Sequence, residues 1–182
     1  MLVGEFGPTA LSAGTSNVMK GGSMAAETTA SKTAKFLLKL AGERGLEISN
    51  LKLQKLLYYS QGWHLGILEK PLFGERIEAW IRGPVVPPVY GEFKCFRWEP
   101  IPLESYSEST IEPGDPRWPI ETHLSEVLDT YGKLNGRELE LRTHREKPWL
   151  DARVGLVADS PSTALISCDS MMAFFKPQVR KA

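Results

Sequence analysis

The stretch of residues 53–67 constrains the fold of this chain more than any other part of its sequence. Apolar and aromatic side chains recur there at helical spacing and also fill positions in between, as in the consecutive Leu56 and Leu57. A helix that is apolar around most of its circumference must be buried. The pattern therefore predicts a central helix of the domain, beginning after Ser49 or Asn50, both of which are favourable N-caps.

Apolar residues at the spacing i, i+3, i+4 and i+7 predict further helices on both sides of this one. They are expected from Ser31 to a stop at Gly45, over residues 124–131, after a cap at Asn135, briefly at Pro148, and from a cap at Ser167 to a stop at Pro177. Gly62 lies inside the central helix and costs about 1 kcal/mol relative to alanine. Close packing of another element against it would explain its presence.

One short segment has the alternation of a strand. In residues 77–82 every second side chain is apolar, which predicts a half-buried strand with Ile77, Ala79 and Ile81 on its buried face. Gly83-Pro84 is expected to end it.

The segments that follow the strand are rich in proline. Residues 85–88 are expected to be extended, because residues before proline avoid the helical region, and Pro88 can begin a short helix. Residues 99–119 hold five of the thirteen prolines and predict a long exposed loop.

These elements together predict a mainly α fold, a single compact helical domain with a small β element. The domain is expected to span residues 31–176, with a short C-terminal tail at 177–182. Residues 1–30 are rich in Gly, Ala, Ser and Thr, a composition that cannot offset the entropy of ordering, so we expect a flexible tail. Met19 and Met24 are alternative start positions within it.

Composition argues against several classes of protein. The chain has 22 basic and 22 acidic residues, which is unlike a polybasic nucleic-acid binder. Its two cysteines, Cys95 and Cys168, form no CxxC pair, so we expect neither a zinc finger nor a disulfide framework, and a reducing, cytoplasmic setting. No apolar run has the roughly 18 residues of a membrane span. The first basic residue, Lys20, comes too late for a signal peptide.

Charge is distributed unevenly along the sequence. Residues 32–98 carry 11 basic and 6 acidic side chains, whereas residues 99–151 carry 6 basic and 12 acidic ones. The two parts either form solvated faces or meet differently charged partners, and the sequence leaves both interpretations open.

The sequence contains none of the common catalytic motifs. It has no phosphate-binding glycine loop, no HExxH and no GxSxG. Glu140 and His144 lie at i and i+4, but such a pair is more typical of a helix surface than of a metal site. Cys168 is expected in the core, and nothing in the sequence places a base beside Cys95. We therefore expect no catalytic residue, no cofactor and no bound metal.

Two binding functions remain. The first two helices are joined by a short turn and carry several lysines, as helix-turn-helix units do, which makes a DNA-binding transcriptional regulator the alternative reading. The second helix, however, has few side chains that can read bases. The many aromatic residues between Tyr58 and Trp98 instead fit a core or a rigid surface that binds a protein partner.

Residues 53–65, LQKLLYYSQGWHL, resemble the opening signature of the Panacea domain, the SocA-like antitoxin domain. The rest of the family pattern follows in order: 71–73 (PLF), 77–80 (IEAW), 83–90 (GPVVPPVY), 93–94 (FK), Leu139, 143–146 (THRE), 148–149 (PW), 152–153 (AR), 166–167 (IS) and 174–175 (FF). The resemblance covers roughly residues 32–176 and leaves the N-terminal tail outside.

The resemblance implies a bacterial or phage toxin–antitoxin system. Panacea-domain proteins are antitoxins that neutralise a partner toxin, usually by direct binding, and in the SocA-type case the antitoxin is an adaptor that hands its toxin to the ClpXP protease. The expected partners are thus a cognate toxin and, in the adaptor form, ClpXP, with no membrane and no nucleic acid. The family implies no catalytic residue.

Twelve signature positions become candidates for partner binding, although several of them could equally determine the fold. They are Gln54, Tyr58, Gln61, Trp63, His64, Trp80, Gly83, Pro84, Val85, Tyr90, His144 and Trp149.

Overall fold

The computed structural model describes residues 25–157 and 159–179. The helices are α1 (Ala30–Glu43), α2 (Asn50–Leu68), α3 (Pro87–Phe93), α4 (Ile120–Tyr131), α5 (Gly136–Thr143), α6 (Lys147–Ala152) and α7 (Cys168–Phe175). Short 3-10 turns are η1 (Lys94–Phe96), η2 (Leu103–Tyr106) and η3 (Lys176–Gln178), and the strands are β1 (Ile77–Trp80), β2 (Gly83–Val85) and β3 (Leu165–Ile166). The predicted mainly α fold with a small β element is confirmed.

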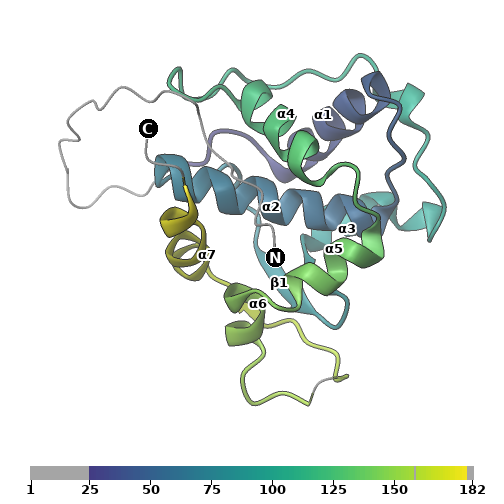
Figure 1. Ribbon diagram of the computed structural model, residues 1–182. Coiled ribbons are helices and arrows are strands. Elements are labelled where there is room, and N and C mark those ends of the chain that lie inside the picture. Colours follow the sequence, from purple (N-terminus) through teal and green to yellow (C-terminus); the bar gives the residue numbers. More distant parts are fainter. Residues whose placement is uncertain (1–24, 158, 180–182) are drawn as a thin grey trace.

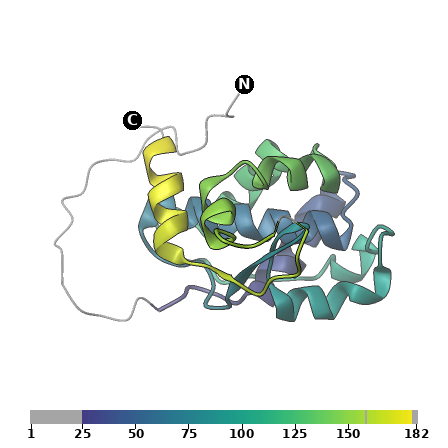
Figure 2. The same ribbon diagram turned by 90° about the horizontal axis from the view of Figure 1, so that it is seen from below.

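Helix α2 crosses the middle of the domain, and the other elements surround it (Figure 1). Helices α1 and α4 cover one side, α7 and α5 pack on others, and strand β2 lies against the helix as well (Figure 2). The Ser49 side chain caps α2 by accepting a hydrogen bond from the Lys52 amide. The buried central helix expected from residues 53–67 is therefore confirmed, with Leu53, Leu57 and Tyr59 wholly inaccessible to solvent.

Gly62 is the point of closest approach between α2 and α7. A Cβ at this position would lie 2.2 Å from Cε2 of the Phe175 ring, a distance that no real contact permits. Phe175 in turn packs edge-on against Tyr58, Tyr59 and Trp63, with ring centroids 5.0–6.3 Å apart. The missing side chain thus lets an aromatic ring from the far end of the chain enter the centre of the core.

The sheet is small and its strands are all antiparallel, in the order β2-β1-β3. The expected alternation over residues 77–82 holds only in part, because the chain already turns after Trp80. Ile81 is consequently 39% exposed, whereas Glu78 is buried and binds Arg76 and the Trp80 indole. The expected end at Gly83-Pro84 is also wrong, since this dipeptide belongs to the second strand of a hairpin.

Several local predictions are confirmed. Gly45 adopts a φ of 64° after α1, and Asn135 and Glu138 form a capping box at α5. Helix α3 begins at Pro87, one residue before the expected Pro88, so the extended segment ends at Val86 and not at residue 88. Residues 99–119 contain no long element, as expected, but the loop is not exposed throughout, because Ile101 and Trp118 are buried. Strand β3 was not predicted, because two residues carry no periodicity.

The prediction that Cys168 lies in the core is wrong. Cys168 is the first residue of α7 and is exposed. On this face Met171 and Phe175 are buried, whereas the side chain of Cys168 reaches only the edge of α2, where Gln61 Nε2 lies 3.9 Å from its Sγ.

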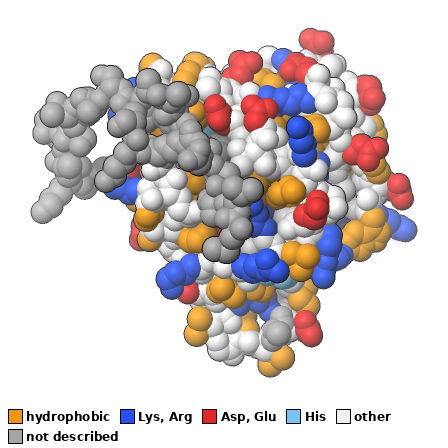
Figure 3. Space-filling view, in the orientation of Figure 1, with side chains coloured by type: hydrophobic (Ala, Val, Ile, Leu, Met, Phe, Trp, Pro, Cys, Tyr) orange, Lys and Arg blue, Asp and Glu red, His pale blue; other side chains and the backbone are white. Residues whose placement is uncertain are grey.

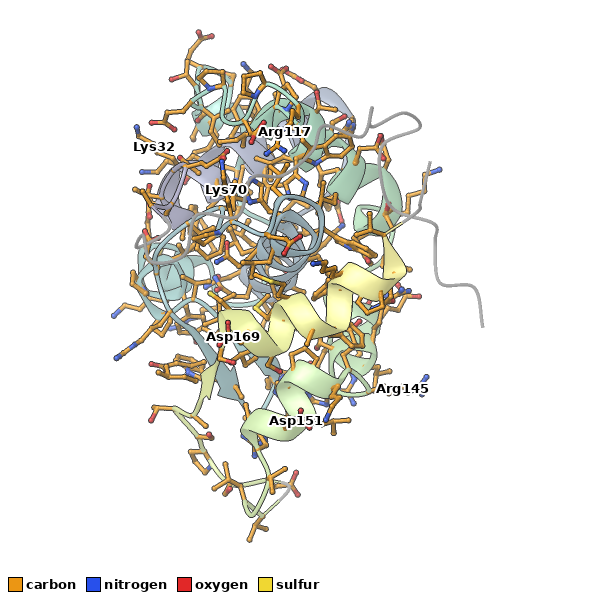
Figure 4. All side chains as sticks on the ribbon, turned by 90° about the vertical axis from the view of Figure 1, so that its left-hand side faces the viewer. Lys32, Lys70, Arg117, Arg145, Asp151 and Asp169 are labelled. Atoms are coloured by element: carbon orange, nitrogen blue, oxygen red, sulfur yellow. The ribbon has the colours of Figure 1, made fainter. Side chains whose placement is uncertain are left out.

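The segment that precedes α1 is fastened to the domain. Residues 1–24 of the expected tail lie outside the described residues, but the Thr28 amide donates to the carbonyl of Leu72 at 2.9 Å. Lys32 pairs with Glu112, and Asp115 pairs with both Lys70 and Arg117. Figure 4 shows Lys32, Lys70 and Arg117 at one end of the molecule, away from Asp151 on α6. The long proline-rich loop is therefore tied by ion pairs to α1 and to Lys70, which follows α2, and by a hydrogen bond from the Thr28 hydroxyl to Glu112 to the N-terminal segment.

Substitution of Gly62 tests the packing of α7. Alanine favours a helix by about 1 kcal/mol, yet we expect Gly62→Ala to lower the free energy of unfolding by about 1–3 kcal/mol, because the new methyl group overlaps the buried Phe175 ring. Chemical denaturation measures this. Gly91→Ala is the matched control: Gly91 lies in α3 with nothing within 4 Å of the added Cβ, so it is expected to be neutral or stabilising. Equal effects of the two changes would contradict the proposed contact.

Candidate partner-binding surface

A pocket of about 290 Å³ opens beside the β1–β2 hairpin. We call it the hairpin pocket. Its lining comes from α2, the hairpin, α3 and the residues after α3: Asn50, Leu51, Gln54, Trp80, Ile81, Arg82, Val85, Tyr90, Lys94, Arg97 and Trp98. Four of the twelve candidates, Gln54, Trp80, Val85 and Tyr90, meet here although they are spread over 37 residues of sequence.

Gln54 holds the backbone that surrounds the pocket through hydrogen bonds in the protein interior. Its carbonyl oxygen accepts the Val86 amide at 3.0 Å, and its amide nitrogen donates to Asn50 Oδ1 at 2.9 Å. Asn50 then donates to the carbonyl of Tyr90 at 3.2 Å. A buried glutamine that uses both ends of its amide holds its neighbours in one arrangement, so α2 fixes where the hairpin ends and where α3 begins.

The start of strand β2 packs against a buried lysine, Lys55. Lys55 Nζ donates to the carbonyl of Pro84 at 2.9 Å and is wholly inaccessible to solvent. Gly83 adopts a φ of 95°, and a Cβ there would come within 2.8 Å of Lys55 Cε and 2.9 Å of Thr143 Oγ1. The signature dipeptide Gly83-Pro84 therefore supplies a backbone shape and an acceptor, and both residues are buried.

Burial lowers the pKa of Lys55 to about 7, although Glu140 nearby raises it. Glu140 is itself buried and pairs with Arg137 and with Arg82, whose Nε lies 3.5 Å from Oε2. The buried lysine and carboxylate thus link α2, α5 and the hairpin turn.

Cationic and aromatic side chains form the rim of the pocket. The Arg82 guanidinium lies 4.7 Å from the centroid of the Trp98 ring, a cation–π contact, and Trp98 is 68% exposed. The Tyr90 ring meets Trp80 edge-on at 5.0 Å. Arg97 has a φ of 52° and a ψ of −109°, a strained backbone of a kind found at functional sites. The pocket therefore combines apolar rings with accessible positive charge.

His144 and Trp149 lie behind the hairpin. Their rings stack at 4.1 Å with an angle of 16°, and the Trp149 indole donates to the carbonyl of Trp80 at 3.0 Å. They support β1 but do not line the hairpin pocket.

The remaining four candidates, Tyr58, Gln61, Trp63 and His64, are buried in α2 and do not line the pocket. Gln61 accepts the amides of Leu72 and Phe73 and donates to the carbonyl of Phe73. His64 Nδ1 lies 2.7 Å from the carbonyl of Lys70. These contacts explain the two residues as fasteners of the turn after α2.

The tyrosines of α2 belong to an internal network. Tyr59 stacks on Tyr131 at 3.9 Å and donates to Glu146 at 2.9 Å, while the Trp63 indole donates to the Tyr131 hydroxyl. Burial raises the pKa of Glu146 to about 7, with the hydrogen bond from Tyr59 acting against it. The network joins α2, α4 and the start of α6.

The three histidines and the two cysteines have different surroundings. Burial lowers the pKa of His123 to about 3, and this neutral ring accepts the Trp118 indole at Nδ1 and donates to the carbonyl of Ser60. Cys95 and Cys168 are exposed, and neither has a histidine as a hydrogen-bond partner among the described residues. No cluster of three metal-ligating side chains occurs in the part of the chain that the structure describes.

Four of the five lysines on the two helices that suggested DNA binding, all except Lys39, are paired with carboxylates or backbone carbonyls. Lys52 and Lys55 are buried and donate to backbone carbonyls, and Lys35 pairs with Glu92 at 2.8 Å. Lys32 pairs with Glu112. Little unpaired positive charge therefore remains on the two helices to support the helix-turn-helix interpretation. Sequence reasoning instead missed Arg82, Lys94, Arg97 and Trp98 as a group, for which the net positive charge of residues 32–98 was the available signal.

Comparison with known proteins gave two matches. The family model described as "Antitoxin SocA-like, Panacea domain" matches residues 53–150. The curated protein Antitoxin SocA of Caulobacter vibrioides (strain NA1000 / CB15N) is 33% identical over 142 residues, which cover 72% of this chain and 71% of that protein. No solved structure matches significantly. No helix among residues 25–157 and 159–179 is long and apolar enough to span a membrane.

Lys55 gives a prediction for the pH dependence of stability. Its pKa is about 7 in the fold and about 10.4 when unfolded, so above pH 7 the unfolded chain binds a proton that the folded chain does not. The free energy of unfolding should then rise with pH, by up to about 1.4 kcal/mol per unit, between about pH 7 and 8.5.

Lys55→Met should remove this rise, as measured by chemical denaturation at several pH values. Lys133→Met, at an exposed position, is the control and should keep the slope of the unchanged protein. A slope that persists in Lys55→Met would show that another group causes it.

Proposed function

The chain belongs to the Antitoxin SocA-like, Panacea domain family, and on this premise we propose that it neutralises a toxin by binding it directly at the hairpin pocket. The observation that carries the proposal is the convergence of Gln54, Trp80, Val85 and Tyr90 on one open pocket. Partly exposed aromatic rings beside arginine are the side chains that most often dominate protein–protein binding energy. The rest of the family signature holds this surface in place from within.

The rigidity of the pocket supports the proposal. Gln54, Asn50 and Trp149 each hold the backbone of the hairpin or α3 by hydrogen bonds from neighbouring helices. A surface that is already in its binding arrangement loses less conformational entropy when a partner binds. We therefore assign the exposed pocket residues to binding and the buried signature residues to support.

We further propose that the protein has no enzymatic activity of its own and acts in the cytoplasm, where its toxin would be made. Delivery of the toxin to ClpXP is a second mode of the same function. An adaptor needs one surface for its cargo and another for the unfoldase. The exposed apolar residues Val154, Leu156 and Val157, which follow α6, are available as that second surface.

Co-expression with the product of the adjacent gene tests the function. That gene is expressed alone and together with this protein, in hosts with and without ClpXP. Rescue of growth and a stable complex in both hosts are expected for direct neutralisation. Rescue only with ClpXP, accompanied by loss of the toxin, would favour the adaptor. Absence of both toxicity and a complex would contradict the proposal for that gene pair.

Truncation of the pocket aromatics tests the surface. Trp80→Ala and Tyr90→Ala should each weaken toxin binding by at least about 1–2 kcal/mol, because they remove large side chains from the centre of the contact. Isothermal titration measures the affinity, and circular dichroism checks that the variants fold. Leu141→Ala, at an exposed apolar position on α5, is the control. Unchanged affinity in folded Trp80 and Tyr90 variants would make these residues fold determinants only.

The absence of catalysis is tested separately. The double variant Cys95→Ala, His144→Ala should retain full neutralisation in the growth assay, since it removes one exposed thiol and one imidazole without touching the proposed contact residues. Loss of neutralisation in a double variant that still binds the toxin would indicate a chemical role.

A further inference from the structure

We propose that the hairpin pocket and the groove next to it recognise a segment of the toxin that carries acidic residues at one end and a large apolar residue at the other. This inference rests on the proposed function and adds the chemistry of the partner. It follows from the shape of the surface, the position of its cations and the absence of an ion pair at Lys94 and Arg97 among the described residues.

The surface extends beyond the pocket. A second, almost wholly apolar hollow of about 280 Å³ is lined by Trp80, Ile81, Pro161, Ser162 and Thr163. Trp80 and Ile81 line both hollows, so the two lie next to each other at the hairpin. A partner segment a few residues long can therefore contact both at once.

The two ends of this surface differ in charge. Arg82, Lys94 and Arg97 all line the hairpin pocket, and all three are exposed. The apolar groove is lined by no charged residue. In the space-filling view, basic and hydrophobic side chains are most frequent on the lower half of the molecule, with a few acidic ones among them, while most acidic side chains lie over the upper and right-hand parts, where some basic ones also occur (Figure 3). A segment with one acidic end and one apolar end fits this surface in one orientation only, with its acidic end at the cations.

The cations of the pocket are available to a partner. Lys94 and Arg97 form no ion pair within the described part of the chain, and no acidic side chain lines the pocket. The nearby carboxylate of Glu78 is buried and already bound by Arg76 and the Trp80 indole. A carboxylate brought by the partner would thus meet Lys94 and Arg97, which pair with no acidic side chain in the part of the chain that the structure describes.

Arg82 is oriented for such a contact. Its guanidinium lies between the Trp98 ring, at 4.7 Å, and Glu140, which Arg137 also neutralises. The planar guanidinium of arginine can hold a second carboxylate through its remaining N–H groups. Trp98, which lines the pocket and is 68% exposed, would then be covered by the bound segment.

The apolar groove argues against a nucleic-acid backbone as the occupant. A phosphate chain needs cations along its whole length, but here they occupy one end only. A protein segment with mixed character fits both ends. The test below includes binding of nucleic acid as one of its possible results.

The test uses charge reversal in the full chain. The double variant Lys94→Glu, Arg97→Glu is compared with Lys133→Glu, Arg145→Glu, which changes two exposed cations outside both hollows. The probe is the toxin from the adjacent gene, titrated by calorimetry at low and at high salt. Thermal unfolding confirms that both variants fold.

We expect the pocket variant to bind at least tenfold more weakly and to lose most of the salt dependence of the dissociation constant, because it removes opposite charges from the contact. The control should change affinity less than threefold. Substitution of acidic toxin residues by lysine should restore binding to the pocket variant only.

Other results would overturn the inference. If the two variants bind the toxin equally well, the proposal that the toxin segment is acidic is wrong. The proposal that this protein neutralises the toxin would be unaffected. Binding of a 20-nucleotide DNA that is lost in the pocket variant would assign the surface to nucleic acid. Failure of the unchanged protein to bind any toxin would instead contradict the proposed function itself, and the inference with it.

Discussion

Helix α2 is buried around almost its whole circumference, and most of the polar side chains that it carries have their partners inside the protein. Gln54 binds the start of α3 and the backbone after β2, Lys55 binds the hairpin turn, and Gln61 binds the turn at Leu72 and Phe73. An unpaired polar group in such a place costs roughly 1–3 kcal/mol. These bonds therefore do more than add stability. They select one position for each neighbouring loop, because any other position leaves a buried group without a partner.

This requirement separates the two roles of the family signature. The buried members, such as Tyr58, Gln61, Trp63 and His64, build the frame, while Trp80 and Tyr90 stand at its surface beside accessible cations. A partner would therefore contact only a few of the residues that define the family. The exposed arginines around them, Arg82 and Arg97, do not belong to the signature and contribute positive charge to the pocket.

Much of the fold could be predicted from sequence, since it depends on local rules. The helices followed from apolar spacing, and Ser49, Asn135 and Ser167 act as caps as their residue types suggest. Gly62 could be marked as a close approach, but not its neighbour, because Phe175 is brought there only by tertiary packing. The same limit applied to Cys168 and Ile81, whose exposure depends on where a helix docks and where a hairpin turns. In the candidate site, Trp80 and Tyr90 were found through the signature. Arg97 was missed because nothing local in the sequence places it beside them.

The contact between Gly62 and Phe175 also bears on how the chain is made. Helix α2 is synthesised early and α7 late, and Gln61 and Cys168, which meet across the same two helices, are 107 residues apart. Until α7 emerges from the ribosome, one side of the central helix has no cover. Non-local contacts of this kind slow folding and leave hydrophobic surface exposed in the meantime. The nascent chain therefore exposes an apolar surface during synthesis that the compact folded form hides.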